Sequence, residues 1–177
     1  QDAAIRRTIE AIGNNQKRIL LSLATGTGKT HIAKHLFWKL SKSGSLRKAL
    51  FLVDRDELRT QAMNHLQGMF GDDADEIKSN SKSFNAKILI GTYQTLNISN
   101  EDKDPYFWKK NFPKNYFSHI LIDECHRSAW GKWSVILEDN PDAIQIGLTA
   151  TPRKIKENNR IKNNKEFKED MLINSNN

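Results

Sequence analysis

The sequence predicts a three-layer α/β domain built around a mainly parallel β-sheet. Short continuous apolar runs such as Ala49–Val53 recur along the chain, and segments with helical periodicity such as Glu57–Phe70 separate them. A glycine-rich turn joins the first apolar run to the first long helical segment. Strands that are apolar on both faces are covered by helices on both sides, which is typical of parallel sheets.

The spacing of apolar residues predicts the individual elements. Spacings of three and four predict helices over residues 2–13, 29–41 and 57–70. Uninterrupted apolar runs predict strands over residues 18–23, 49–53, 87–90, 119–122 and 144–148. Residues 71–85 are polar and are expected to form a loop.

An aromatic segment, residues 105–112, interleaves aromatic side chains with lysines. This pattern fits a platform on which nucleic-acid bases stack. It also fits a surface helix that packs its aromatic side chains on the sheet, and this is the interpretation that we favour.

Length and composition indicate one domain without a membrane span. The chain has 177 residues, of which 37% are hydrophobic and 28% charged, and domains run at roughly 100–200 residues. Its apolar runs are far shorter than the roughly 20 residues that cross a bilayer, so no membrane partner is expected. The single cysteine, Cys125, excludes an internal disulfide and favours a cytoplasmic protein. A net charge of +7 favours polyanionic partners such as nucleic acid or nucleotides.

Composition also divides the chain in two. Residues 1–152 are expected to form the folded domain, and residues 153–177, rich in lysine and asparagine, a linker or a poorly ordered tail. The chain starts with Gln1 instead of methionine, so we expect it to be part of a longer protein.

The most informative motif is Leu23–Thr30, between the first predicted strand and a predicted helix. Glycines let the backbone approach phosphate oxygens, amide groups at a helix start bind anions, and the lysine and threonine serve the phosphates and Mg²⁺. Leu23 stands where the general pattern has glycine, so only the core of the motif is intact. A turn that binds nothing is the alternative, but a lysine at a helix start is unfavourable without an anion. Nucleotide binding is assigned to Thr25, Gly26, Thr27, Gly28, Lys29 and Thr30.

A pair of carboxylates follows the fourth predicted strand. In enzymes with a phosphate-binding loop, an aspartate at the end of a neighbouring strand holds Mg²⁺, which here is Asp123. Glu124 can orient or deprotonate the attacking water. Both residues could instead cap the next helix, but the loop some 95 residues upstream favours the catalytic interpretation.

Six ordered segments together resemble the first motor lobe of superfamily 2 helicases, from Gln1 to about Arg153, and this resemblance implies a RecA-like fold. They are the upstream glutamine at Gln1, the loop 23–30, 51–58 with Gln61, the Thr-x-x-Thr segment 92–95, 123–128 and 148–152. The forms of 53–58 and 123–133 are similar to the motor subunit of type I restriction enzymes. Type III restriction subunits and excision-repair helicases are close alternatives.

The resemblance also implies roles for residues. ATP and Mg²⁺ are the implied cofactors: Gln1 contacts adenine, Lys29 and Glu124 are catalytic, and Thr30 and Asp123 hold the metal. Coupling of nucleotide state to movement falls to His126, Thr149 and Thr151, with local hydrogen bonding as the alternative. Contacts to the DNA backbone fall to Arg55, Thr92 and Gln94, with a solvated charge or helix capping as alternatives.

The implied activity is ATP hydrolysis coupled to movement on double-stranded DNA, which powers restriction cleavage. The implied partners are a second RecA-like lobe and a nuclease domain of the parent chain, both absent from this fragment, and methylase and specificity subunits. A repair helicase is one alternative, and a nucleotide-dependent DNA-binding module without turnover is another. Without the second lobe and its arginine, the fragment is expected to be nearly inactive.

Overall fold

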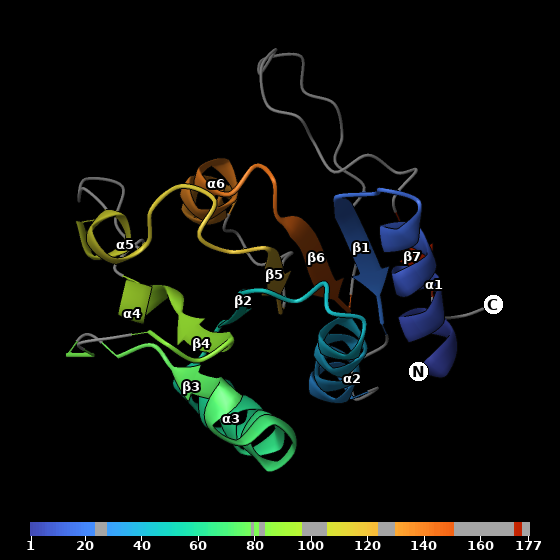
Figure 1. Cartoon of the computed structure of the whole chain (residues 1–177), viewed down its shortest axis with the longest axis horizontal. Coiled ribbons are helices and arrows are strands. Elements are labelled where there is room, and N and C mark those ends of the chain that lie inside the picture. The colour runs from blue at the N-terminus through green and yellow to red at the C-terminus, as the bar shows by residue number, and fades with distance from the viewer. Residues whose placement is uncertain are drawn as a thin grey trace.

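The computed structural model describes residues 1–23, 28–78, 80–81, 84–96, 106–123, 130–150 and 172–174 (Figure 1). The helices are α1 (Asp2–Gly13), α2 (Lys29–Lys42), α3 (Asp56–Phe70), the 3₁₀ helix η1 (Gly71–Asp73), α4 (Tyr93–Leu96), α5 (Tyr106–Asn111) and α6 (Trp130–Asp139). The strands are β1 (Arg18–Ser22), β2 (Ala49–Val53), β3 (Ala74–Glu76), β4 (Ile88–Thr92), β5 (His119–Ile122), β6 (Ile144–Thr149) and β7 (Leu172–Asn174).

The described strands form one sheet in the order β3-β4-β2-β5-β6-β1-β7. Every neighbouring pair is parallel, which confirms the predicted fold class. All carboxyl ends therefore meet at one edge of the sheet, where open α/β sheets bind their ligands.

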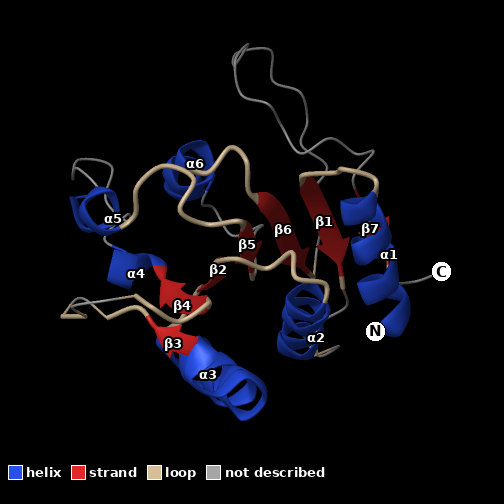
Figure 2. Cartoon of the chain, viewed as in Figure 1, coloured by secondary structure: helices blue, strands red, loops and turns tan. Residues whose placement is uncertain are grey.

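Helices cover both faces of the sheet, as the uninterrupted apolar strands predicted (Figure 2). The helices α1, α2 and α3 bury their apolar side chains on one face, and α4, α5 and α6 lie over the other. Alternate residues of β2 belong to different cores: Phe51 faces the first group of helices, and Leu50 and Leu52 face the second. The domain is thus a three-layer structure.

The predicted loop over residues 71–85 is wrong for its first six residues, which form η1 and the strand β3. β3 pairs with β4, so that Ala74 lies opposite Ile88 and Glu76 opposite Ile90. A three-residue strand at the edge of a sheet buries little beyond Ala74, so its sequence lacks the apolar run that marks the central strands.

A second strand lies within the segment expected to be a linker or tail. Leu172 and Ile173 of β7 pair in parallel with Leu20 and Leu21 of β1. These two residues belong to a short apolar run, Met171–Ile173, in a segment that is mostly polar. The remainder of residues 153–177 falls outside the described part of the chain, and the predicted boundary after residue 152 stays a prediction.

The aromatic segment packs on the sheet, as we favoured. Trp108 in α5 and Phe112 just after it are buried. The ring of Trp108 stacks on Phe117 at a centroid distance of 5.8 Å, and its Nε1 donates a hydrogen bond of 2.8 Å to Asp139 Oδ2. These side chains are committed to the core and are not available to stack on bases. Across the described residues, no helix has the length and apolar character that a membrane span requires.

Candidate functional site

Three neighbouring strands bring the main sequence motifs to one edge of the sheet. In the central part of the sheet, β6 lies between β5 and β1. Ile122 is opposite Gly147, and Ser22 is opposite Thr149. Three adjacent strands therefore end at these motifs. Asp123 follows β5, Thr149 is the last residue of β6, and the glycine-rich loop begins just after β1.

A hydrogen bond ties the start of the glycine-rich loop to the end of β6. The amide of Leu23 donates to the carbonyl oxygen of Thr149 at 2.8 Å, and both residues are buried. This bond places two predicted motifs in direct contact, although 126 positions separate them in the sequence (149 − 23). Thr25, Gly26 and Thr27 lie outside the described residues.

The end of the loop requires glycine. Gly28 precedes α2 with φ 74° and ψ 50°, which is the left-handed region that side chains disfavour. A Cβ atom at Gly28 would lie 3.1 Å from Gln1 Nε2 and 3.5 Å from His31 Cβ. The structure therefore brings Gln1 against the end of the loop, and its predicted contact with adenine stays a prediction.

The amino terminus of α2 is suited to bind an anion. Gly28 has no side chain with which to cap the helix, and N–H groups at the start of a helix commonly bind an external anion. No acidic residue lies in that turn, and Lys29 and Thr30 are its first two residues. A positive dipole end and a lysine together favour phosphate over any neutral ligand.

The carboxylate of Asp123 stands at the carboxyl end of β5. Asp123 is 7% exposed, and its amide donates to the carbonyl oxygen of Leu52 at 2.8 Å, which continues the pairing with β2. A carboxylate and a threonine hydroxyl are oxygen ligands of the kind that Mg²⁺ prefers, so Asp123 and Thr30 fit a Mg²⁺–nucleotide. Glu124, His126 and Thr151 lie outside the described residues.

The residues predicted to contact DNA lie on the other half of the same edge, on β2, β4 and the segments that follow. Thr92 is opposite Val53, but its side chain is buried, and its hydroxyl is 3.0 Å from Thr95 Oγ1 and accepts the Thr95 amide at 3.3 Å. In this structure Thr92 caps α4, which was the alternative role. Gln94 is exposed. Arg55 is exposed too, 3.6 Å from the Asp54 carboxylate.

Two histidines of α2 were not singled out by the sequence. The rings of His31 and His35 have centroids 4.3 Å apart. Partial burial lowers the pKa of His35 below 6.5, and the nearby His31 and Lys34 lower that pKa further, while the carboxylate of Asp2 opposes part of this shift. The signal that could have identified them is their spacing of four residues, directly after the loop.

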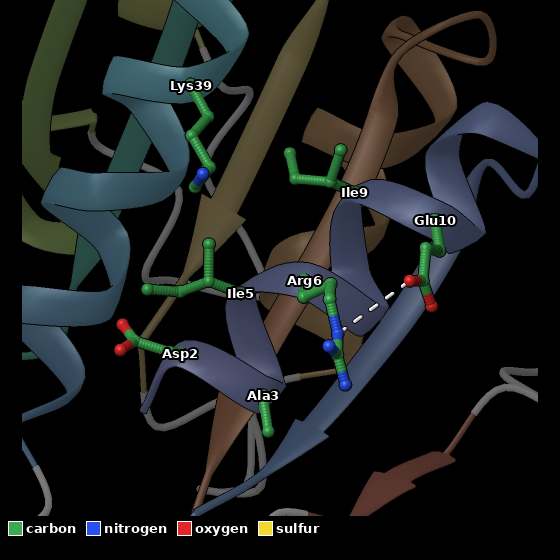
Figure 3. Close-up of a pocket in the computed structure, with 7 residues that line it drawn as sticks. All are labelled: Asp2, Ala3, Ile5, Arg6, Ile9, Glu10 and Lys39. Carbon is green, nitrogen blue, oxygen red and sulfur yellow. Dashed lines mark ion pairs between the residues drawn. The ribbon is translucent and has the colours of Figure 1, made fainter.

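A hollow between α1 and α2 lies apart from these residues (Figure 3). Ile5 and Ile9 line it from α1 and Lys39 from α2, and Arg6 forms a 3.8 Å ion pair with Glu10 at its border. None of the residues predicted to bind nucleotide or DNA lines this hollow.

A parallel sheet with a glycine-rich loop before a helix, and with an aspartate at the end of a nearby strand, defines a P-loop domain. Residues 1–154 match the family described as ResIII, type III restriction enzyme, res subunit. The chain belongs to this family.

Sequence relatives include endonuclease subunits of type I restriction enzymes. The EcoAI subunit of Escherichia coli is 38% identical over 157 residues, which are 87% of this chain and 19% of that protein. The EcoKI subunit of Escherichia coli strain K12 is 30% identical over 182 residues, covering 86% of this chain and 15% of the relative. The chain thus spans about a fifth or less of these relatives.

Solved structures support the fold. The helicase domain of Hef from Pyrococcus furiosus has a TM-score of 0.63 and 23% identity, covering 85% of this chain and 33% of that chain. A nuclease-deletion mutant of the type ISP restriction-modification enzyme LlaGI, in complex with a DNA substrate mimic, has a TM-score of 0.61 and 22% identity. The match covers 86% of this chain and 17% of that chain. Together with the family match, these findings confirm the resemblance to the first lobe of superfamily 2 helicases.

Proposed function

We propose that this chain is the ATP-binding motor lobe of a DNA translocase. The observation that carries this proposal is the convergence at the carboxyl edge of the sheet. There, the Leu23–Thr149 hydrogen bond, the left-handed Gly28 at the start of α2 and the buried Asp123 come from adjacent strands. This arrangement suits a ligand that carries both phosphate groups and a divalent cation.

Each residue of the site has a task that its chemistry allows. The first-turn amides of α2 and Lys29 bind the β- and γ-phosphates, and Gln1 contacts the adenine edge from beside Gly28. Thr30 and Asp123 hold Mg²⁺, which stabilises negative charge on the phosphates when bound. Glu124 orients the attacking water and accepts its proton.

The same edge couples nucleotide to DNA. The Leu23–Thr149 hydrogen bond connects the nucleotide loop directly to the segment that contains Thr149 and Thr151. His126 lies three positions after Asp123, the residue assigned to Mg²⁺. Arg55, Thr92 and Gln94 contact the phosphate backbone of double-stranded DNA, so recognition is sequence-independent. For Thr92, this contact requires its hydroxyl to leave the Thr95 hydrogen bond.

In the parent protein, movement along DNA driven by ATP hydrolysis powers restriction cleavage by a separate nuclease domain. The printed names of the relatives, endonuclease subunits of type I restriction enzymes, support this proposal. The second motor lobe belongs to the same parent chain, and methylase and specificity subunits complete the assembly. A neighbouring pair of methylase and specificity genes would distinguish this function from that of a repair helicase.

Binding without turnover is the alternative of another class. Glu124 speaks against it, because a switch that only binds nucleotide has no use for a carboxylate that activates water. The isolated lobe nevertheless hydrolyses ATP slowly, because an arginine from the opposite lobe stabilises the transition state by about 10³–10⁵ in rate.

Binding of a fluorescent ATP analogue with Mg²⁺ tests the nucleotide site. Lys29→Ala should weaken binding by at least about 100-fold, since a charge-assisted contact to phosphate is lost. Lys39→Ala, further along the same helix, is the matched control and should bind as the unaltered chain does. Equal binding by Lys29→Ala would exclude the site.

A steady-state ATPase assay with and without duplex DNA tests the division of the site between the lobes. We expect turnover near background in both conditions. Turnover of several per second that rises with DNA and disappears in Glu124→Gln would show that this lobe holds a complete catalytic site.

A further inference from the structure

The helix that follows the nucleotide loop carries two histidines whose rings lie side by side. His31 and His35 are four residues apart in α2, so both side chains project from the same face of the helix. Their ring centroids are 4.3 Å apart, and the ring planes are inclined by 52°. The helix itself fixes this spacing, and no loop has to order for the rings to meet.

Both rings are open to solvent. His31 is exposed and His35 is half-buried, whereas their neighbours Ile32 and Ala33 are fully buried in the core. Within the described residues, neither imidazole forms a hydrogen bond or an ion pair that would occupy its nitrogens. The pair is therefore held by a helix whose opposite face is buried in the core, and both rings remain accessible from solvent.

We propose that His31 and His35 chelate a single transition-metal ion of the Zn²⁺, Ni²⁺ or Cu²⁺ class on the surface of α2. An ion about 2 Å from each of two nitrogens in tetrahedral geometry holds those nitrogens about 3.3 Å apart. Two histidines four residues apart on one helix face are an established zinc-binding arrangement, and here the ring centroids are 4.3 Å apart, so rotation about the side-chain bonds should bring one nitrogen of each ring to that separation. The pair therefore matches the requirement without movement of the backbone.

The chemistry of the donors separates this site from the Mg²⁺ of the nucleotide. Imidazole nitrogens select Zn²⁺, Ni²⁺ and Cu²⁺, whereas Mg²⁺ prefers carboxylate, hydroxyl and phosphate oxygens. The carboxylate of Asp2, which Figure 3 shows at the start of α1, partly opposes the lowering of the His35 pKa that burial, His31 and Lys34 cause.

The site has two protein ligands and is not a hydrolase centre. Histidines with this spacing bind zinc in metalloproteases, where a glutamate beside the first histidine serves as base. Here that position is Ile32, which is buried. No group of three His, Cys, Asp or Glu side chains among the described residues is arranged to hold a metal. Water therefore completes the coordination, and the ion is exchangeable.

Calorimetric titration of the chelator-treated chain with ZnCl₂, in the presence of excess Mg²⁺, tests the proposal. We expect one ion per chain at this pair. His31→Gln and His35→Gln should each weaken binding by more than the roughly 10-fold that loss of an outer-shell partner costs. His65→Gln is the matched control, because His65 is exposed on α3 and should leave affinity unchanged.

Thermal unfolding gives a second readout that requires no nucleotide. Zn²⁺ should raise the Tm of the unaltered chain and of His65→Gln, because an ion that bridges two turns of α2 binds only the folded helix. The rise should be absent in His31→Gln. Zinc binding of equal affinity in a folded double variant of His31 and His35 would place the ion elsewhere, for example at Cys125 and His126, and overturn the proposal. Absence of zinc binding to the unaltered chain would also overturn it.

Discussion

The two ends of the central strands differ in what their polar groups do. At the amino-terminal end, the segments that precede the strands bond to one another, as in the amide of Ser118 to the carbonyl of Lys48 at 2.8 Å and that of Ile144 to the carbonyl of Ser118 at 2.9 Å. At the carboxyl-terminal end lie the glycine-rich loop, Asp123 and Thr149. Polar groups at the amino-terminal end stabilise the fold, whereas those at the carboxyl-terminal end form the candidate site.

Side chains at the amino-terminal end satisfy backbone groups of the fold itself. Lys48 Nζ donates to the carbonyl of Ala86 at 2.6 Å and to that of Phe84, and lies 5.4 Å from the ring centroid of Tyr116. Burial lowers the pKa of this lysine. The lysine at the other end, Lys29, is the first residue of α2, and the start of a helix is a place where anions bind. Substitutions should therefore change stability at the first end and binding at the second.

The largest effect is expected for Trp108→Ala at the amino-terminal end. Trp108 is fully buried, packs on Phe112 and Phe117, and donates a hydrogen bond to Asp139. Its removal leaves a cavity and an unpaired carboxylate, which should lower the free energy of unfolding by about 3–5 kcal/mol in urea titrations. Trp38→Ala removes an exposed ring from α2 and should cost less than about 1 kcal/mol. Similar losses in both variants would contradict the assignment of Trp108 to the core.

The next effect is a pH dependence that comes from His119. Burial, together with the positive charge of Arg47, lowers its pKa from 6.5 to about 4, and its Nε2 has no hydrogen-bond partner among the described residues. Between these two values the unfolded chain takes up a proton that the folded chain does not. The free energy of unfolding should therefore fall as pH decreases from 6.5 to about 4, by up to about 3 kcal/mol.

His119→Gln isolates this contribution from the carboxylates that also titrate in acid. Its stability should change less between pH 6.5 and pH 4 than that of the unaltered chain, whatever its stability at neutral pH. His65→Gln, which alters an exposed histidine, should keep the full dependence. An identical slope in all three proteins would show that folding does not lower the pKa of His119.

The sequence was sufficient to predict a helix or strand when the residues of that element alone show an apolar pattern. β2, β5 and α1 were predicted with the observed bounds, because an uninterrupted apolar run or a regular apolar spacing lies within each of these elements. β3 and β7 were missed, because what makes three residues a strand is the neighbour with which they pair. The same distinction applies to the site. The loop and Asp123 were predictable from motifs, but the Leu23–Thr149 bond depends on the register of β1 and β6.

At the carboxyl-terminal end, Gly28→Ala should separate binding from stability. An alanine at φ 74° costs about 1 kcal/mol, and its Cβ would also meet Gln1 Nε2 at 3.1 Å. We expect at least about tenfold weaker binding of an ATP analogue, since both the loop and Gln1 are displaced. Gly44→Ala is matched, because Gly44 also has φ 74° but nothing within 4 Å of a Cβ. It should lose similar stability and keep nucleotide binding, and equal binding losses would refute the local explanation.

The smallest effect is expected for Arg55→Ala, on the half of the edge assigned to DNA. Arg55 is exposed, and its ion pair with Asp54 is a surface contact worth little, so folding should not change. If its guanidinium neutralises one phosphate, the slope of log K against log salt should become shallower by about 0.9, with a loss of a few-fold in affinity at low salt. Arg6→Ala, which removes an exposed arginine of α1 away from that edge, should leave the slope unchanged.

Fluorescence anisotropy with two unrelated duplexes measures both the salt slope and the affinity. The loss of affinity should be equal for the two sequences, because a contact to phosphate does not depend on the base. An unchanged slope in Arg55→Ala would remove this arginine from the DNA contacts, whereas a change confined to one duplex would assign it to base recognition.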